Sequence, residues 1–433
     1  MSIEIKSAPT ALRGAVRGRV WLPGDEGFDG ARRPWNLAVE QPVAAVVEAA
    51  DAADVAALVR FAGAAGHPVA TQPNGHGATG RTAGTILLRT SRLDGIDVDA
   101  AARRARIGAG VRSGALQAAA AAHGLTGLPG SSPVVSVAGV ALGGGLSWFG
   151  RAYGWVADSV TAFDVVDATG TARRVTGESD PDLFWALRGG GGDYAVVTGL
   201  ELTLREAPSL FGGRMLWQGR HARAVAEAFR AITADAPDAL TVWFELLHFP
   251  GAEPMVAVDS TYLGGEASAR SLLAGLDALP APIGDSRRPM SVAELGAITA
   301  EPTEPSAGMS RAALLTTLDG APEALLAEPI APLMAVQVRH LGGALARPSD
   351  SPHGALREPY LVYLFGAPSP AVAERQRALV ELLPASGRKP VTFLAPDESL
   401  GDALGAEAID RLREIKARRD PSGVFRANFS AGA

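Results

Sequence analysis

The clearest periodic pattern in the chain is an amphipathic stretch near its start. Apolar side chains recur three or four positions apart between Asp51 and Ala65, which predicts a helix with one buried face. Asp51 is placed to cap the first turn of this helix, and Gly66 ends it. Short aliphatic runs at 43–47 and 69–71 predict strands on either side. The pattern therefore predicts a strand–helix–strand unit at the start of the fold.

The remaining hydrophobic patterns predict strands and helices along the rest of the chain. Up to residue 205, they predict strands at 86–88, 104–108, 160–167, 171–175 and 195–205, and helices at 113–122 and 182–187. Beyond it, they predict strands at 240–247, 255–262, 335–341 and 360–365, and helices at 222–231, 267–276, 371–382 and 406–418. The stretch 125–154 between these groups is too glycine-rich for either regular pattern.

Composition changes near Pro208, where the glycine clusters become fewer, and this change predicts a domain boundary. We expect a basic, turn-rich lead-in at 1–34, a glycine-rich domain at 35–208, a second domain at 209–399 and a C-terminal segment at 400–433. The alternation of strands and helices in the second domain predicts an antiparallel sheet covered by helices. The predicted fold class is therefore α+β.

Composition and charge exclude several classes of protein. Of 433 residues, 47% are hydrophobic and 20% charged, which excludes a mainly disordered chain. A net charge of −6 argues against a nucleic-acid partner. Without cysteine there are no disulfides, thiolate metal sites or thiol nucleophiles, and we expect no metal site. Because no apolar leader or membrane-length apolar run is visible, we expect a cytoplasmic protein with no membrane association.

Three glycine-rich segments, 73–80, 127–145 and 189–192, lie between predicted strands or where a strand changes to a helix. Successive exposed amides form anion-binding concavities and let a flat ligand approach the main chain. Only Lys6, Lys389 and Lys416 are lysines, so main-chain amides or arginine must hold any phosphate. The segments therefore predict a cofactor cradled by main chain, with ordinary turn glycines as the alternative.

Common catalytic and nucleotide motifs are missing from the chain. The G-x-G-x-x-G pattern at 75–80 runs into the strand at 86–88, whereas a Rossmann site needs a helix there to hold the pyrophosphate. No Walker sequence, G-x-S-x-G elbow or HExxH occurs. Nucleotide hydrolysis, serine hydrolysis and zinc proteolysis thus lack their usual signals.

Five segments in order carry a resemblance to a known family. They are PVATQPNGHGATG, SPVVSVAGVALGGGLSWFGRAYGWVADSV, RGGGGDYAVVTGLEL, VRHLGGALA and DPSGVFRANFS, of which VRHLGGALA is the weakest. Together they resemble the vanillyl-alcohol-oxidase and berberine-bridge-enzyme flavoproteins, which carry the FAD-binding domain named for p-cresol methylhydroxylase (PCMH). The resemblance covers most of the chain. It implies that 35–208 is a two-part PCMH-type domain, that 209–399 binds substrate, and that 400–433 returns to the FAD domain.

The resemblance implies FAD as cofactor, bound covalently through His76 at its 8α-methyl group. Bicovalent attachment is excluded, because Ser132 stands where such members have a cysteine and the chain has none. Asn74 replaces the first glycine of the family's G-G-H. The cofactor-binding residues carried over from the motifs are His76, Gln72, Pro73, Asn74, Gly75, Gly77, Gly80, Ser132, Val135, Ser136, Gly139, Gly143, Gly144, Leu146, Val197 and Asn428.

The family's usual base, a tyrosine in Y-x-N-F, is missing, since Pro390-Val391-Thr392-Phe393 stands in its place. Tyr360 and Tyr363 are three apart on one predicted strand and project from opposite faces, so at most one can face a cavity above the flavin. Tyr363 and His340 are the predicted base candidates, with core or sheet packing as the alternative for each.

The resemblance implies an oxidase that moves a hydride from a small organic substrate, such as an alcohol, an amine or a natural-product intermediate, to flavin N5. O2 would then reoxidise the flavin and yield H2O2, and tailoring of secondary metabolites is the expected role. A flavin-dependent dehydrogenase or a redox-neutral cyclase on the same scaffold is the first alternative. A noncatalytic binding module that kept the fold is the second. The sequence does not predict the substrate or the oligomeric state.

Overall fold

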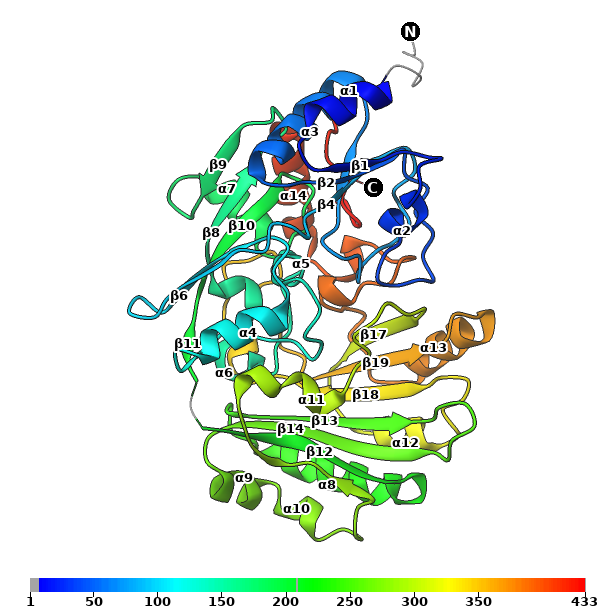
Figure 1. Cartoon of the computed structure of the whole chain (residues 1–433). Helices are drawn as coiled ribbons and strands as arrows, with labels where there is room; N and C mark the ends of the chain where they lie inside the picture. The colour runs from blue at the N-terminus through cyan, green and yellow to red at the C-terminus, as the bar shows by residue number, and fades with distance from the viewer. Residues whose placement is uncertain (1–7, 208, 433) are drawn as a thin grey trace.

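The computed structural model describes residues 8–207 and 209–432 as an elongated molecule with three main sheets. Two sheets form the upper part in Figure 1, and an eight-stranded sheet crosses the lower part. The first seven residues of the predicted lead-in and Pro208, where the predicted change of composition falls, lie outside the described residues. The mixed helix-and-sheet architecture confirms the predicted α+β class.

The first sheet surrounds the strand–helix–strand unit. Its order is β1 (Arg19–Trp21), β2 (Ala45–Glu48), β4 (Ile86–Arg89) and β3 (Val69–Thr71), with β2, β4 and β3 parallel. Helix α3 (Ala52–Ala65) connects β2 to β3. The Asp51 carboxylate accepts hydrogen bonds from the amides of Ala53 and Asp54, and Gly66 ends the helix at a φ of 70°. Cap, helix and end residue are therefore as predicted.

The second sheet is antiparallel and follows in the chain. Its order is β5 (Ile96–Asp99), β6 (Arg104–Gly108), β10 (Val196–Thr203), β8 (Val160–Val166) and β9 (Ala172–Val175). Its connections hold α4 (Ser113–Ala121), α5 (Val137–Leu142), α6 (Gly150–Tyr153) and α7 (Pro181–Leu187), and the short strands β7 (Leu125–Thr126) and β11 (Arg205–Glu206) pair beside it. The segment 125–154 thus contains short helices that its glycines concealed.

The third sheet is antiparallel throughout. Its order is β15 (Gly284–Asp285), β12 (Leu210–Gln218), β14 (Met255–Leu263), β13 (Leu240–Leu247), β18 (Ala335–His340), β19 (Tyr360–Gly366) and β17 (Met309–Leu315), and β16 (Arg288–Met290) also pairs with β12. One face is covered by α8 (Ala222–Ala234), α9 (Glu266–Leu272), α10 (Ala274–Asp277), α12 (Ala321–Leu326) and α13 (Pro370–Leu382). Figure 1 shows the opposite face turned toward the upper part.

Strand β19 shows how side chains divide between these two faces. Tyr360, Val362 and Leu364 belong to the core under the helices, and the Tyr360 hydroxyl bonds the Thr233 hydroxyl of α8 at 2.9 Å. Leu361 and Tyr363 instead pack in a cluster that reaches the upper part. This alternation confirms that Tyr360 and Tyr363 project from opposite faces.

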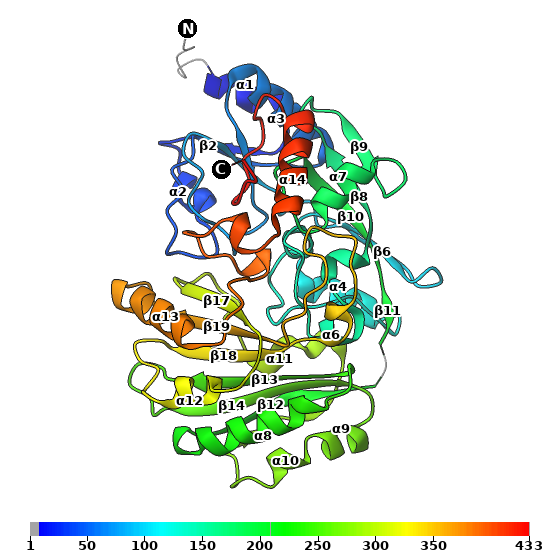
Figure 2. The same ribbon diagram turned by 180° about the vertical axis from the view of Figure 1, so that it is seen from behind.

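After the third sheet the chain returns to the upper part. Helix α14 (Ala406–Arg419) lies beside α7, as Figure 2 shows. Val69 of β3 then pairs with Phe425 in a parallel bridge, accepting a hydrogen bond from the Arg426 amide at 2.9 Å. The end of the described chain is therefore held against the strand that precedes His76.

Several elements were not predicted from the sequence. The lead-in contains α1 (Ala8–Ala15), β1 and α2 (Phe28–Arg32), and β5, β12, β17 and α11 (Gly296–Thr299) were also missed. The helix predicted at 267–276 is broken into α9 and α10 at Leu273. Among the described residues, none of the helices has the length and apolar character needed to cross a bilayer.

Candidate cofactor site

His76 lies in the loop that follows β3, and its ring is held from two sides. The Trp35 ring stacks on it with centroids 4.3 Å apart. Its Nδ1 lies 3.0 Å from Asn74 Oδ1, and the Asn74 Nδ2 donates to the Val134 carbonyl at 2.8 Å. The Val134 carbonyl can only accept a hydrogen bond, so the amide nitrogen of Asn74 must face it and the amide oxygen must face His76. Because that oxygen also only accepts, the ring proton of His76 must be on Nδ1. The other ring nitrogen, Nε2, is buried without a hydrogen-bond partner.

The surroundings of His76 keep it neutral. Burial, together with the positive charge of Arg112, lowers the pKa of His76 to about 4. At neutral pH the imidazole therefore has a free lone pair on Nε2, and this is the state a nucleophile needs. Gly75 makes the tight loop possible, because it has a φ of 79° and a Cβ there would lie 2.7 Å from the Pro34 Cβ.

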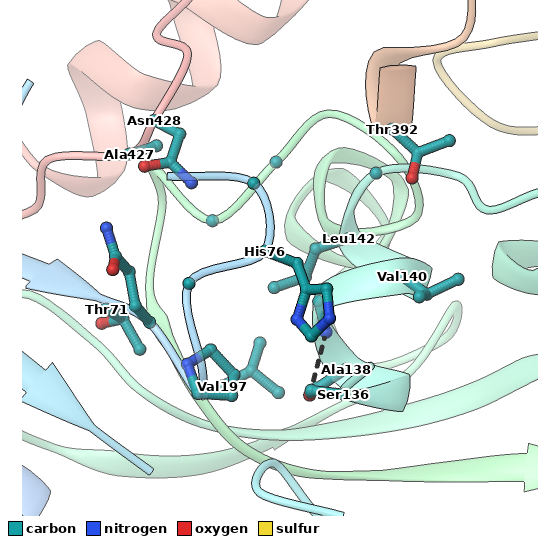
Figure 3. A pocket seen from close by; sticks show the side chains of 18 of the residues that line it. Thr71, His76, Ser136, Ala138, Val140, Leu142, Val197, Thr392, Ala427 and Asn428 are labelled. Carbon is teal, nitrogen blue, oxygen red and sulfur yellow. Dashed lines mark hydrogen bonds between the residues drawn. The ribbon is translucent and has the colours of Figure 1, made fainter. Parts of the chain in front are cut away.

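Ser136 positions the second part of the site. Its hydroxyl donates to the Ala109 carbonyl at 2.9 Å and accepts from the Gly139 amide at 3.3 Å, which caps α5. These bonds fix the start of α5 against the second sheet. Val135, Ser136, Gly139 and Gly143 thereby join the pocket lining, and Figure 3 shows Ser136 across the pocket from Asn428.

The C-terminal segment forms the third part and is anchored by a buried ion pair. The Lys416 ammonium donates to the Asp420 carboxylate at 2.7 Å and to the Asp193 carboxylate at 3.3 Å. Asp193 also accepts from the Ala427 amide at 3.1 Å and the Ser430 hydroxyl at 2.6 Å. These contacts tie the segment to the glycine cluster that precedes β10.

The three parts enclose one pocket with a volume of about 350 Å³, shown in Figure 3. Twelve of the sixteen predicted cofactor residues line it: Gln72, Pro73, Asn74, Gly75, His76, Gly77, Val135, Ser136, Gly139, Gly143, Val197 and Asn428. Loops and element ends from all three predicted glycine-rich segments therefore converge, since Gly191 and Gly192 line the pocket as well.

Four of the predicted cofactor residues, Gly80, Ser132, Gly144 and Leu146, do not line the pocket. Leu146 packs in the cluster between the upper part and the third sheet. Gly144 lies against His353, whose Nε2 would be 2.3 Å from a Cβ at that position.

The reasons for the other two differ. Gly80 has a φ of 76° and packs closely against the Glu40 carbonyl. The glycine is therefore needed for the backbone turn at this position and not for contact with the pocket. Ser132 lies half-buried before Pro133, outside the lining. Motif resemblance alone could not separate residues that face the pocket from residues that shape the loop behind it.

Sequence reasoning missed part of the lining. Of the lining residues not named singly, Ala138, Val140, Leu142, Gly191 and Gly192 lie within the predicted glycine-rich segments, and the missed residues are Thr71, Thr90, Ala109, Ala195, Val391, Thr392, Leu394, Leu400, Arg426, Ala427 and Phe429. Arg426 is the one lysine, arginine, aspartate or glutamate in the lining formed by the described residues. Its place in the terminal motif was a usable signal, because a lysine-poor chain must hold phosphate with arginine or amides.

The pocket fits FAD on several independent observations. Its volume lies within the range of cofactor sites. Its wall is mostly main chain and small apolar side chains, which allow close approach of a flat ring system. Arg426 offers a cation for phosphate, and the partnerless Nε2 of His76 offers a nucleophile.

The two predicted bases lie in different places. Tyr363 faces the upper part, where its ring packs edge-on against Phe393 at 5.8 Å, and the neighbouring Thr392 lines the pocket. Burial raises the pKa of Tyr363, so it is a neutral phenol at physiological pH.

His340 projects from the opposite face of the third sheet, so the structure does not support its predicted role as a base. Its Nε2 lies 3.0 Å from an Arg151 nitrogen, and its ring stacks on Tyr360 at 5.5 Å. It lines a separate cavity with Thr233 and Asp319. The sequence placed His340 on the right strand, but the strand's alternation turns it toward the helices.

Comparison with known proteins decides the family. Residues 43–176 match the model of an FAD-binding domain. (R)-6-hydroxynicotine oxidase from Paenarthrobacter nicotinovorans is 33% identical over 306 residues, which cover 68% of this chain and 66% of that protein. The chain belongs to the FAD-binding superfamily of PCMH and vanillyl-alcohol oxidase. The matched regions span less than two thirds of that oxidase and less than half of the fungal FAD-linked relatives.

Solved structures of this superfamily share the fold. A 6-hydroxy-D-nicotine oxidase from Arthrobacter nicotinovorans superposes with a TM-score of 0.81 at 26% identity, covering 95% of this chain and 97% of that one. A berberine-bridge-enzyme-like protein from Physcomitrella patens superposes with a TM-score of 0.85 at 20% identity, covering 98% of both chains. The second likeness concerns the fold alone.

Proposed function

We propose that this member of the superfamily is an FAD-dependent oxidase of a small organic molecule. When bound, FAD supplies a two-electron acceptor that takes a hydride from the substrate at N5 and passes the electrons to O2, with H2O2 as product. The observation that carries the proposal is the convergence of His76, the glycine-rich segments and Arg426 on one pocket. The oxidases among its relatives support it further.

His76 is proposed to tether FAD through its 8α-methyl group. Its neutral state, its buried Nε2 without a partner and its place in the pocket lining all support this role. A chain without cysteine can offer no second tether of the family's kind. The amides of the glycine-rich segments are proposed to hold the rest of the cofactor, together with Arg426.

The substrate is proposed to lie between the pocket and the face of the third sheet that is turned toward the upper part, in the domain proposed at 209–399. Tyr363 is the remaining candidate for moving a proton, because it lies on that face beside Phe393. With its raised pKa, Tyr363 is a neutral phenol, so it would accept a hydrogen bond from the substrate O–H or N–H and take up that proton while its own phenol proton passes to water. Pro390 cannot replace the family's tyrosine.

A flavin-dependent dehydrogenase or a redox-neutral cyclase on the same scaffold is the second candidate. Both share the pocket with an oxidase and differ in the fate of the electrons. The relatives include a fungal FAD-linked oxidoreductase as well as a nicotine oxidase, so this candidate stays open. A role in tailoring secondary metabolites and a cytoplasmic location are further parts of the proposal.

Visible absorption before and after acid precipitation tests the cofactor and its tether together. We expect a yellow protein whose colour stays in the acid pellet, and His76→Ala is expected to release all of its flavin into the supernatant. His67→Ala is the matched control, because His67 precedes β3 outside the pocket lining. A colourless protein would refute the cofactor, and acid-stable flavin in His76→Ala would refute the tether.

Peroxide release under air separates the two candidates. A panel of alcohols, amines and hydroxylated aromatics is incubated with the yellow protein, and H2O2 is measured with a coupled peroxidase. We expect H2O2 in proportion to substrate consumed. Substrate turnover with an artificial electron acceptor, but without H2O2 under air, would instead identify a dehydrogenase.

A further inference from the structure

Arg339 is a buried cation on the face of the third sheet that is turned toward the FAD-binding part. It belongs to β18 and has 8% of its surface exposed. Three aromatic rings surround its guanidinium: Trp243 at 4.0 Å, Phe393 at 5.2 Å and Tyr363 at 5.6 Å from their centroids. These rings fix the guanidinium in one place and exclude water from its faces.

Two of the three acidic groups that act on Arg339, Glu245 and Asp259, are bound by Arg214. Arg214 donates to both oxygens of Asp259, at 2.6 and 2.7 Å, and to Glu245 at 2.8 Å. Gln337 donates to the other oxygen of Glu245 and accepts from the Nε of Arg339. Arg339 therefore has the neutral amide oxygen of Gln337 as its hydrogen-bond partner, whereas the carboxylates of Glu245 and Asp259 pair with Arg214.

Arg339 itself has no carboxylate within ion-pair distance among residues 8–207 and 209–432, and none of their hydrogen bonds uses its two terminal nitrogens. Glu301, Glu245 and Asp259 act on it only through longer-range attraction. A buried charge without an ion-pair partner is costly, so such a group is a candidate for a ligand-binding residue. A guanidinium offers paired donors that match the two oxygens of a carboxylate.

The side chains around Arg339 connect it to the cofactor pocket. Tyr363 and Phe393 are half-buried, whereas the residues beside Tyr363 on β19 are buried. Thr392, next to Phe393, is exposed and lines the pocket. Arg339, Tyr363 and Phe393 do not line the pocket themselves, so a ligand would have to extend past Thr392 to reach Arg339.

We propose that Arg339 binds an anionic oxygen group of the substrate, of which a carboxylate is the best match, and so selects acidic substrates over neutral or amine ones. This inference rests on the proposed function, because it places the substrate between the third sheet and the flavin. An amine would find Glu245 and Asp259 already bound to Arg214 and would meet the positive charge of Arg339, and of the acids that act on Arg339 only Glu301 lies outside these ion pairs.

Calorimetric titration of the purified holoprotein with sodium benzoate, benzamide and benzylamine hydrochloride tests the proposal. Benzoate and benzamide have similar shape and differ in charge. We expect benzoate to bind at least about tenfold more tightly than either other probe, a difference of about 1.4 kcal/mol. Arg339→Met is expected to abolish this preference, and Arg339→Lys, which keeps the charge, to retain part of it.

Arg230→Met is the matched control, because Arg230 lies exposed on α8 with only a long contact to Asp319. It should keep the full preference for benzoate. Equal binding of the three probes to the parent protein, or an unchanged preference in a folded Arg339→Met variant, would overturn the proposal. Calorimetry needs no flavin signal, so a colourless protein that still prefers benzoate would refute the proposed oxidase function and leave the anion site standing.

Discussion

At the scale of single residues, the pair formed by Asn74 and His76 departs most informatively from the family pattern. Where the family has glycine, Asn74 donates to the Val134 carbonyl and presents its oxygen to His76 Nδ1. The hydrogen bond fixes both the ring orientation and the tautomer, and thus determines which nitrogen has the lone pair. The replacement was visible in the sequence, but its effect depended on a carbonyl 60 positions away in the chain.

The first prediction concerns the nitrogen that forms the tether. Because Asn74 holds the proton on Nδ1, the histidyl-flavin peptide isolated after proteolysis should be linked through Nε2, as assigned by NMR. Asn74→Gly should lower the acid-stable flavin fraction or give a mixture of both linkages. Asn74→Asp keeps an acceptor and should retain the Nε2 linkage, and linkage of the parent protein through Nδ1 would contradict the argument.

At the scale of elements, the site depends on how well α14 and the segment after it are anchored to the glycine cluster before β10. Asp193 and Asp420 are buried and share Lys416, and Asp193 also fixes the amide of Ala427. Removing one member of a buried ion pair leaves the others without a partner in a poorly solvated place. The anchor thus links the stability of α14 to the shape of the cofactor pocket.

Asp193→Ala is therefore expected to lower the free energy of unfolding by about 3 kcal/mol, measured by urea denaturation. The same variant should lose flavin during purification, since Ala427 and Asn428 would no longer be held in the pocket wall. Asp182→Ala provides the comparison, because the Asp182 side chain is 41% exposed and pairs with Arg411 and Arg418 on the surface of α14. Its effect should stay below about 1 kcal/mol, and equal losses in both variants would count against the anchor.

Elements with a strong local pattern could be predicted from the sequence, and elements that depend on distant partners could not. The bounds of β3, β6 and β13 agree with prediction, as do those of α3 and α13 within one residue. Strand β12 was missed because its Gly212-Gly213 pair resembles a turn. In the structure Gly213 has a φ of 148° and lets the Arg287 main chain approach, since a Cβ there would lie 2.6 Å away.

Strand β17 was missed for a different reason. Its Ala312-Ala313-Leu314-Leu315 run has helix-forming residues, but pairing with β19 along its whole length imposes the extended form. The same distinction holds for the site. Motif positions in loops were predicted, whereas Val391 and Thr392 were missed because their segment lacks the tyrosine and asparagine of the family motif with which it aligns.

At the scale of the whole molecule, three histidines are buried at different places in the fold. Burial lowers the pKa of His76 to about 4, of His340 to about 3 and of His353 to about 4. Each is therefore neutral in the folded protein, whereas the unfolded chain binds protons below about pH 6.5. Since the unfolded state binds more protons between pH 6.5 and 4, the free energy of unfolding must decrease as the pH falls through that window.

Urea denaturation of the flavin-free protein at pH 7.5 and pH 5 should show this decrease, to which each buried histidine contributes about 2 kcal/mol at most. His353→Gln tests one of the three, because the fully enclosed ring of His353 bonds the Gly143 carbonyl at 3.1 Å and stacks on Trp155. The variant should lose part of the pH dependence. An equal pH dependence in the parent protein and in His353→Gln would refute the assignment.

The third sheet is formed by one continuous stretch of chain, Leu210–Gly366, while the pocket wall comes mostly from segments before and after it. Recombination with a related protein at two crossover points would therefore replace the whole third sheet, including its substrate-facing surface, without altering most cofactor contacts. His353 limits where the second crossover can fall, because its ring fills the space that Gly144 and Gly189 leave empty. In a chimera, a smaller side chain at position 353 would leave a cavity beside Gly144 and Gly189, and a larger one would clash with them. The residue that the donor protein has at this position therefore decides whether the chimera folds.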